Sequence, residues 1–550
     1  MNRNTESHFG NIPSKDIRRS KFKMPFRHLT SFNTGDIIPI FHKEVLPGDT
    51  FQLNESMLIR MSTPVAPVMD NAWIDTYYFF VPRRLVWEHW AEFMGENKTD
   101  TWTQETEYRI PRVYAPWSTG PDIHNGWEKG SLADYMGFPI NTAYDKDNIN
   151  GCSTWIDACY FRAYALIWNE WFRNENISEP CQISLGDEDI IGTFNLESYV
   201  TGAEKGGQPC KAVKYADYFT RALPSPQKGE DVLLPLGTTA PVIASARDIQ
   251  TSYKDTTVEG KQLGEVSGAI KVFPIDGTAV TSFTTDKRTK FYADLSQATS
   301  ATINQLRQAF AVQRMAELDA RGGTRYIELI ASHFGVHSPD ARLQRPEYLG
   351  GKRVPINIAD VVQMSSTDTT TPQGNVAGMS KTIDAHDTFT YSATEHGIIM
   401  GLAVIRTEHS YQQGVDRELT REKKLDFYWP ALANLGEQYI KNKEIFVGQI
   451  GSGEEAFGYQ EAYAEYRYSR NYITGELNCN YTTPLDIWHY GDEYETLPTL
   501  SHDWISETSE NVARTLAIQD QDQWIADFYF DLTAVRPMPV YSVPSLSSWM

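Results

Sequence analysis

The sequence predicts a mainly β protein in which strands that lie far apart along the chain join a common sheet. Two kinds of segment indicate strands: some have apolar residues at alternate positions, and others are apolar almost throughout. Long stretches, some with the apolar spacing of helices, separate them. Of the 550 residues 41% are apolar and 12% aromatic, which suffices for a large buried core and excludes a disordered chain.

The strand segments are 50–63, 75–81, 398–405 and 528–533. In 50–63 the apolar positions are Phe51, Leu53, Met57, Ile59 and Met61. A period of two places these side chains on one face of a strand, and 528–533 repeats the pattern. The segments 75–81 and 398–405 are apolar at nearly every position, which predicts strands that are covered on both faces.

The stretches between the strands are partly helical. The apolar spacing of 154–173 predicts a helix with one buried stripe. A second helix begins near Ser300 and ends at Gly322-Gly323, and a short helix follows it. Further short helices are predicted over Leu85–Phe93 and Lys423–Tyr439.

Charge is unevenly placed along the chain. The net charge is −21, yet residues 1–30 hold seven Lys and Arg against two acids. An acidic body disfavours wrapping of nucleic acid by the whole surface, whereas a basic terminal arm could reach a polyanion on one side. The alternative is a solvated terminus without a partner. Five cysteines without a CxxC pattern disfavour a disulfide framework and fit a reducing compartment.

The segment 229–290 differs in composition from the rest. It holds ten Thr, six Gly and only three aromatic residues. Such a segment packs little core of its own, so we expect it to project outward as a β-rich loop or small subdomain. No apolar run is long enough for a membrane span, and the N-terminal residues lack the apolar core of a signal peptide.

The stretch 333–351, HFGVHSPDARLQRPEYLGG, concentrates residues that could carry chemistry. His333 and His337 have the spacing of two metal ligands on one helical face. Gly335 lies between them and Ser338-Pro339 ends any helix, so ordinary loop histidines are the favoured interpretation. No metal site and no cofactor are predicted.

No nucleotide-binding or serine-hydrolase motif is present in the sequence. Abundant acids and Trp would fit a soluble β-rich carbohydrate-active enzyme, which needs two carboxylates beside an aromatic platform. This remains the alternative function. The tyrosine-rich run 457–471 instead mixes Tyr, Arg and Glu, as protein–protein interfaces do, although an exposed amphipathic segment has the same composition.

Several long stretches together resemble a known family. They are 34–51, 61–97, 218–229, 294–328, 333–351 and 457–471. In order along the chain they closely resemble the major capsid protein of gokushoviruses, small icosahedral single-stranded DNA phages of the Microviridae. The resemblance implies a non-enzymatic subunit with an eight-stranded antiparallel jelly roll and long, partly helical insertions between the strands.

The resemblance also implies how the chain is organised. Residues 1–27 are a basic N-terminal arm, 28–228 and 291–550 are the two parts of the jelly roll with its insertions, and 229–290 is a candidate threefold protrusion. Copies of the chain would form a T=1 icosahedral shell through fivefold contacts, assembled in the bacterial host cytoplasm and carried in the virion. No membrane insertion is implied.

Candidate contact residues follow from this organisation. The expected contacts with packaged single-stranded DNA or an internal scaffolding protein are Lys15, Arg18, Arg19, Lys21 and Lys23, with Phe22 and Phe26 able to stack on bases. The expected contacts between subunits are Arg342, Arg345, Glu347, Tyr459, Tyr463 and Arg467. A small basic DNA-binding or pilot protein and a host surface receptor, met by 229–290, are the further expected partners.

Overall fold

The computed structural model describes most of the chain. The described residues are 18–96, 107–116, 126–140, 155–193, 198–229, 242–245, 261–266, 269–274, 290–293, 303–323, 325–337, 344–362, 364, 373–374, 376–448 and 451–541. They form two compact units, which are treated separately below. Unit 1 comprises Met1–Pro226 and Gly323–Met550, and unit 2 is Gln227–Gly322.

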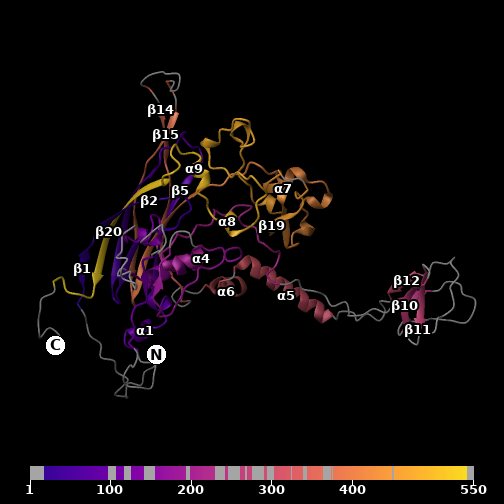
Figure 1. Cartoon of the computed structure of the whole chain (residues 1–550), viewed down its shortest axis with the longest axis horizontal. Coiled ribbons are helices and arrows are strands. Elements are labelled where there is room, and N and C mark those ends of the chain that lie inside the picture. Colours follow the sequence, from indigo (N-terminus) through magenta and orange to yellow (C-terminus); the bar gives the residue numbers. More distant parts are fainter. Residues whose placement is uncertain are drawn as a thin grey trace, which may run out of the picture. The chain divides into compact units, whose positions relative to one another are not determined.

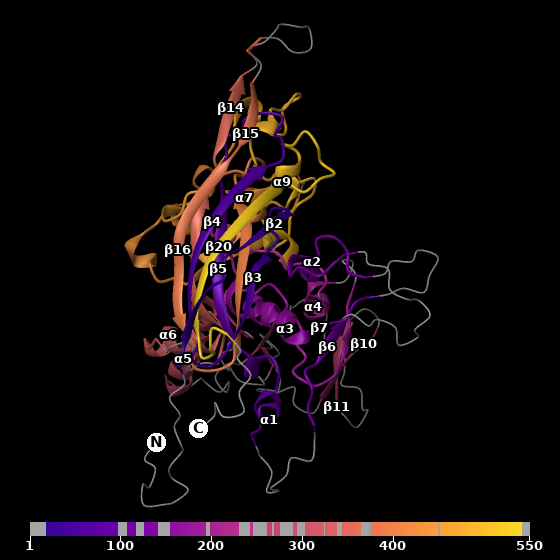
Figure 2. The ribbon, with the colours of Figure 1, turned by 90° about the vertical axis from the view of Figure 1, so that its left-hand side faces the viewer.

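Two antiparallel sheets form the centre of unit 1 (Figures 1 and 2). The first contains β1 (Ser20–Lys23), β2 (Phe26–Phe32), β20 (Trp524–Arg536), β4 (Thr50–Met61) and β16 (Thr382–Ser392). The second contains β3 (Ile38–Val45), β17 (Gly397–Thr407), β5 (Ala72–Pro82) and β13 (Glu347–Pro355). β1 and β2 pair one after the other along the single long strand β20.

The strand pairs nest in chain order. Leaving β1 aside, the first strand of these sheets pairs with the eighth (β2 with β20), the second with the seventh (β3 with β17), the third with the sixth (β4 with β16) and the fourth with the fifth (β5 with β13). Nested antiparallel pairs in two facing sheets are the connectivity of a jelly roll, so the predicted fold class is confirmed.

The space between the sheets is filled with aromatic and aliphatic side chains. The alternate residues of β4 and β20 predicted to face a core are buried, and Phe530 packs on Phe41 of the opposite sheet with ring centroids 5.3 Å apart. Burying a large aromatic side chain contributes on the order of 2–3 kcal/mol. The sandwich core therefore supplies much of the stability of unit 1.

The second sheet is covered on its other face as well. Helix α3 (Ala158–Ile167) and its neighbours pack on the outward side chains of β5 and β17, such as Phe79 and Met400. Nearly every residue of β17 is buried, which confirms the prediction of a doubly covered strand over 398–405. The first sheet differs: outward residues of β4 and β20 such as Arg60 and Tyr529 are exposed.

The excursions between strands carry short elements. Between β5 and β13 lie α1 (Trp90–Phe93), β6 (Arg112–Tyr114), α2 (Leu132–Tyr135), β7 (Trp155–Asp157), β8 (Ile190–Ile191), α4 (Tyr199–Gly202) and α6 (Tyr326–Phe334). Between β13 and β16 lies the hairpin β14 (Ile358–Val362) and β15 (Val376–Ser380). Between β17 and β20 lie β18 (Glu437–Lys441), α7 (Asn442–Ile445), β19 (Ala456–Glu461), α8 (His502–Ile505) and α9 (Glu510–Ala513).

Two helix predictions had different outcomes. The helix predicted over 154–173 is confirmed as α3 followed by a π-helical turn to Phe172. The helix predicted over Lys423–Tyr439 is wrong, because that segment forms two 3₁₀ turns and then β18. The Asp426 side chain accepts hydrogen bonds from two backbone N–H groups there, and Pro430 lacks an N–H, so local contacts displace the helical ladder.

Unit 2 contains two antiparallel strand pairs and a helix. β9 (Val242–Ser245) pairs with β12 (Lys290–Ala293), β10 (Lys261–Val266) pairs with β11 (Ala269–Pro274), and α5 spans Ile303–Gly322. The unit begins at Gln227, close to the start of the predicted insertion 229–290, but continues past residue 290 to Gly322 and so includes α5. In the described ranges, no helix has the length and apolar character needed to cross a bilayer.

Candidate functional site

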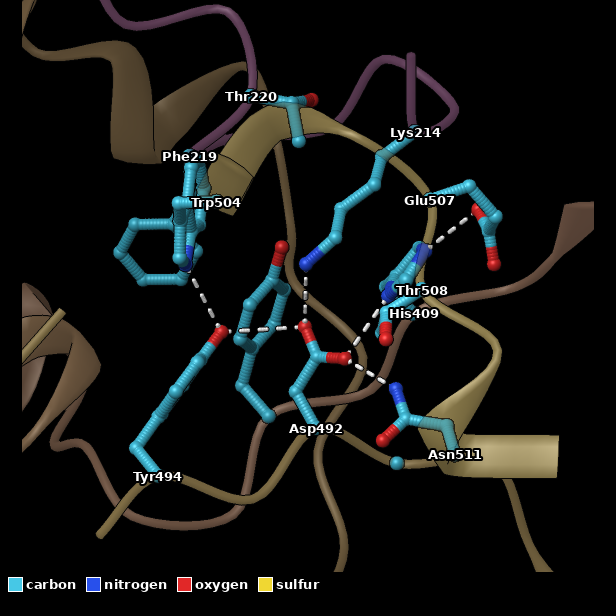
Figure 3. Close-up of polar contacts among 12 residues, drawn as sticks. Lys214, Phe219, Thr220, His409, Asp492, Tyr494, Trp504, Glu507, Thr508 and Asn511 are labelled. Carbon is cyan, nitrogen blue, oxygen red and sulfur yellow. Dashed lines mark hydrogen bonds and ion pairs between the residues drawn. The ribbon is translucent and has the colours of Figure 1, made fainter. Parts of the chain in front are cut away.

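Four ionisable side chains meet in the interior of unit 1 (Figure 3). Lys214 Nζ lies 3.1 Å from one oxygen of Asp492, and His409 Nδ1 lies 3.0 Å from the other. His409 Nε2 in turn lies 2.9 Å from Glu507. All four side chains are buried. Two cations and two carboxylates thus neutralise one another away from water, and we call this set the charge network.

Neutral side chains complete the charge network. Tyr494 donates its hydroxyl to Asp492 at 3.1 Å, Asn511 donates its side-chain amide to the same carboxylate at 2.6 Å, and Trp504 donates its indole N–H to the Tyr494 oxygen at 3.1 Å. Thr407 donates its hydroxyl to Glu507 at 2.7 Å. A buried charge is tolerable only when its hydrogen-bonding capacity is filled in this way.

The electrostatics of the charge network favour the charged form of His409. Burial alone would lower its pKa, but Asp492 and Glu507 more than offset that effect and raise the pKa to about 10. The pKa of Asp492 is held far below its usual range, because Lys214 and His409 outweigh the effect of burial. His409 is therefore a doubly donating imidazolium at neutral pH and has no lone pair with which to act as a base.

The charge network joins distant parts of the sequence. Lys214 belongs to the excursion between β5 and β13, whereas Asp492 and Glu507 belong to the excursion between β17 and β20. His409 follows β17 directly. Sequence reasoning missed this set, since its members are separated by up to 293 positions and form no local pattern. Its effect is to fix two excursions to each other and to the sheet.

A second polar group joins three strands of the sandwich, and only its Glu55 is fully buried. Lys352 of β13 contacts Asp384 of β16 at 2.7 Å, Asp384 contacts His386 Nδ1 at 2.9 Å, and His386 Nε2 lies 3.6 Å from Glu55 of β4. Both oxygens of Glu55 and the hydroxyl of Tyr78 are buried, and Thr76 and Tyr78 face the Glu55 carboxylate. Burial raises the pKa of Glu55 to about 7 and lowers that of His386.

The predicted DNA or scaffold contacts lie at the start of the described chain. Lys15 lies outside the described residues. Arg18 and Arg19 are exposed and precede β1, and Lys21 and Lys23 are exposed at alternate positions of β1. The structure therefore brings Lys21 and Lys23 to one face of the first sheet, beside β20.

The stacking role predicted for Phe26 is wrong. Its ring packs against Phe530 and Phe41 at centroid distances of 5.0 and 5.7 Å, at the edge of the sandwich core. Phe22 pairs with Ala534, whose side chain is buried, so it points to the same inward side of the sheet. Residues 20–27 are thus sheet rather than a free arm because their alternate apolar side chains face the core.

The charged residues predicted as subunit contacts in 333–351 have partners within this chain. Arg342 lies outside the described residues. The guanidinium of Arg345 lies over the Trp171 ring, 4.1 Å from its centroid, and Glu347 accepts the Tyr391 hydroxyl at 3.1 Å. Both residues join the start of β13 to neighbouring elements.

The tyrosine-rich run also packs within the chain. Tyr459 in β19 exchanges backbone hydrogen bonds with Leu223, each of 2.7 Å. Tyr463 is only 5% exposed and donates its hydroxyl to the Leu425 carbonyl at 3.0 Å, so little of it is left for a second subunit. Arg467 is exposed and pairs with Glu461.

The two histidines of the same stretch lie on either side of a helix end. His333 lies in the last turn of α6, and Gly335 ends that helix in a left-handed conformation before His337. Over the described residues no group of three or more His, Cys, Asp or Glu side chains could hold a metal ion. Ser338, Pro339 and Asp340 lie outside those residues.

Comparison with known proteins gives one consistent result. Residues 10–546 match the model of a family described as capsid protein (F protein). The chain is similar to capsid protein VP1 of Spiroplasma virus 4, with 38% identity over 98% of this chain and 97% of that protein. It is 40% identical to capsid protein VP1 of Bdellovibrio phage phiMH2K, over 99% of this chain and 98% of that protein.

A third relative, capsid protein VP1 of Chlamydia phage 1, is 37% identical over 98% of each chain. The similarity spans both sheets, the charge network and the excursions, as expected for a chain that shares the whole fold. Together with the nested strand pairs of the sandwich, these matches settle the family. The chain belongs to the capsid protein (F protein) family of small phages and is a major capsid protein.

Proposed function

We propose that the chain assembles with copies of itself into a T=1 icosahedral shell that encloses a single-stranded DNA genome. Membership of the capsid family carries the self-assembly. The first sheet is the candidate for the side that faces the DNA inside the particle. Its face away from the sandwich core is exposed, whereas the corresponding face of the second sheet is covered by helices. Figure 1 shows β1 and β20 along one margin of unit 1.

The basic start of the chain supports DNA contact at that face. Arg18, Arg19, Lys21 and Lys23 are exposed beside β20, on a chain whose net charge is −21. Cations gathered at one place on an acidic protein are where phosphates bind most favourably. Residues 1–27 therefore face the particle interior and contact DNA or an internal scaffolding protein, with a separate small basic protein sharing the task.

Replacing Lys21 and Lys23 with glutamine tests this contact. Each lost phosphate contact to a single strand reduces the slope of log binding constant against log salt by about 0.7, so the double variant loses about 1.4. The measurement is fluorescence anisotropy of labelled single-stranded DNA on the purified chain at several salt concentrations. The matched control replaces the exposed Lys228 and Lys381, and its slope stays that of the wild type. A slope unchanged by the Lys21 and Lys23 replacements contradicts the proposal.

Segment 229–290 is proposed as the host-attachment surface at the threefold axes. Its composition supports this, with ten Thr, six Gly and few aromatic residues. The pairing of Ser245 with Lys290 offers a clean deletion, because a two-residue Asn-Gly turn can join these paired ends in place of residues 246–289. Particles of this variant should form normally and adsorb to host cells at least tenfold less. Wild-type adsorption by such particles would refute the attachment role.

The localisation and the lack of catalytic activity are also proposed. It is a virion protein by family, and we place its assembly in the bacterial cytoplasm, which the five cysteines without a disulfide framework support. We assign it no catalytic activity. Membership of the capsid family supports this assignment.

A further inference from the structure

The segment between β17 and β18 exposes an unusual amount of apolar surface. Six large apolar side chains within 17 residues are exposed, and we call this set the apolar ridge. With their exposed fractions they are Leu419 (75%), Leu425 (68%), Phe427 (49%), Tyr428 (44%), Trp429 (43%) and Leu435 (59%). Exposed apolar residues scattered singly are ordinary, but a cluster of this kind marks a contact site.

Specific hydrogen bonds fix the backbone conformation that exposes the apolar ridge. Asp426 accepts hydrogen bonds from the backbone N–H groups of Glu422 and Lys423 at 2.9 and 2.7 Å. Trp429 donates its indole N–H to the Lys424 carbonyl at 3.0 Å, which fixes the direction of its ring. The exposure is therefore a property of an ordered backbone that presents these side chains outward.

Part of the tyrosine-rich run packs against the ridge. Tyr428 contacts Tyr463 and Tyr466 with ring centroids 5.5 and 6.2 Å apart. Arg421 lies over the Tyr466 ring at 4.5 Å and pairs with Glu465 at 3.1 Å. The buried Tyr463 thus supports the ridge, and Tyr466, 53% exposed, lies beside it.

The exposed area of the ridge is close to what one side of a stable interface requires. With on the order of 200 Å² for each fully exposed side chain, the six together expose roughly 650 Å². A standard interface buries about 800 Å² on each partner, and crystal-packing contacts bury less than about half of that. The ridge supplies most of the required area with apolar side chains alone.

The charges around the ridge decide what kind of partner it fits. The exposed ionic residues in its segment are two acids, Glu418 and Glu422, and two bases, Lys423 and Lys424, so the segment is close to neutral. The whole chain carries −21. Two copies of an acidic chain repel each other least where the surface is locally neutral, whereas a DNA contact would require an excess of cations.

We propose that the apolar ridge is a contact between two copies of this chain in the shell. This inference rests on the proposed self-assembly and names a segment that carries it. The ridge packs against a neighbouring copy, and burial of Leu425, Trp429 and Leu435 supplies the hydrophobic part of the contact. The buried Tyr463 supports the ridge through its ring contact with Tyr428.

Replacing Leu425 and Leu435 with aspartate tests the contact. Both side chains point to solvent in the single chain, so the variant should keep the wild-type circular dichroism and melting curve. At a concentration where the wild type forms shells, it should sediment as single subunits, with its assembly threshold raised at least tenfold. The matched control carries Met69→Asp and Ile191→Asp, at side chains exposed by 77% and 60%, and keeps the wild-type threshold. Shell formation by the ridge variant at the wild-type threshold overturns the proposal.

A second measurement needs no variant. Hydroxyl-radical oxidation of Trp429, normalised to the buried Trp524, should fall several-fold when dissociated wild-type subunits assemble. Equal oxidation in both states overturns the proposal. A wild-type chain that forms only small oligomers, with Trp429 protected in them, would refute the proposed shell and support the ridge contact. This outcome separates the failure of one idea from the failure of the other.

Discussion

Replacing Asp492 with alanine is expected to lower the free energy of unfolding by about 3–5 kcal/mol, because removing one partner of a buried ion pair leaves the other charge uncompensated. In this chain two cations are left, Lys214 and His409, with Glu507 as the sole remaining carboxylate of the network. The Tyr494 hydroxyl and the Asn511 amide lose their acceptor as well. Urea unfolding of dissociated subunits, followed by tryptophan fluorescence, measures the change.

The control for this prediction is Asp360→Ala, an exposed acid in β14. Its effect should stay within about 0.5 kcal/mol, as for most surface substitutions. A loss of less than about 1 kcal/mol on Asp492→Ala would mean that the charge network does not hold the two excursions together.

Glu55→Gln is expected to remove a pH-dependent loss of stability inside the sandwich. The folded pKa of Glu55 is about 7 and its ordinary value 4.5, so the folded state holds the proton that the unfolded state releases between these pH values. Stability therefore falls as pH rises through that window, by about 3 kcal/mol in all at 1.36 kcal/mol per pH unit, and is constant above it. Glutamine does not ionise, so the variant lacks this fall.

Other ionisable groups close to Glu55 also contribute to the pH dependence of stability. The side chains that face it are Thr76 and Tyr78 on β5, Asp384 and His386 on β16, and Lys352 on β13. The folded pKa of His386 is lowered, so the ionisation of His386 has the opposite effect on stability. It makes stability rise with pH up to about 6.5 and changes nothing above that pH. The difference between Glu55→Gln and the wild type cancels this effect. That difference should be near zero at pH 4.5 and close to 3 kcal/mol in favour of the variant at pH 8; the same difference at both pH values would contradict the prediction.

The periodicity of single segments predicted the strands well. The alternation over 50–63 corresponds to β4, and the continuous apolar run over 398–405 lies in β17, which is covered on both faces. Both patterns are local consequences of which faces are buried. What local pattern cannot contain is the choice of partner: Phe26 pairs with Phe530 across 504 positions, and only the assembled sandwich brings them together.

The candidate contacts show the same limit. Tyr463 is of a residue type that is common in interfaces, yet its hydroxyl donates to the Leu425 carbonyl and its ring packs on Tyr428. The exposed surface is therefore formed by the preceding segment, the apolar ridge. The helix predicted over Lys423–Tyr439 prevented the sequence analysis from recognising this exposed surface, because a helix would have placed half of its apolar residues on a buried face. Lys214, His409, Asp492 and Glu507 carry no signal in the sequence at all, since each is an ordinary residue until the excursions meet.

Electron microscopy of the full-length chain, expressed alone and together with the other structural proteins of its phage, tests the central claim most directly. The account predicts uniform icosahedral particles of T=1 size, with the first sheet facing the interior and segment 229–290 on the outer surface. A chain that stays a dispersed, folded monomer under both conditions would contradict it.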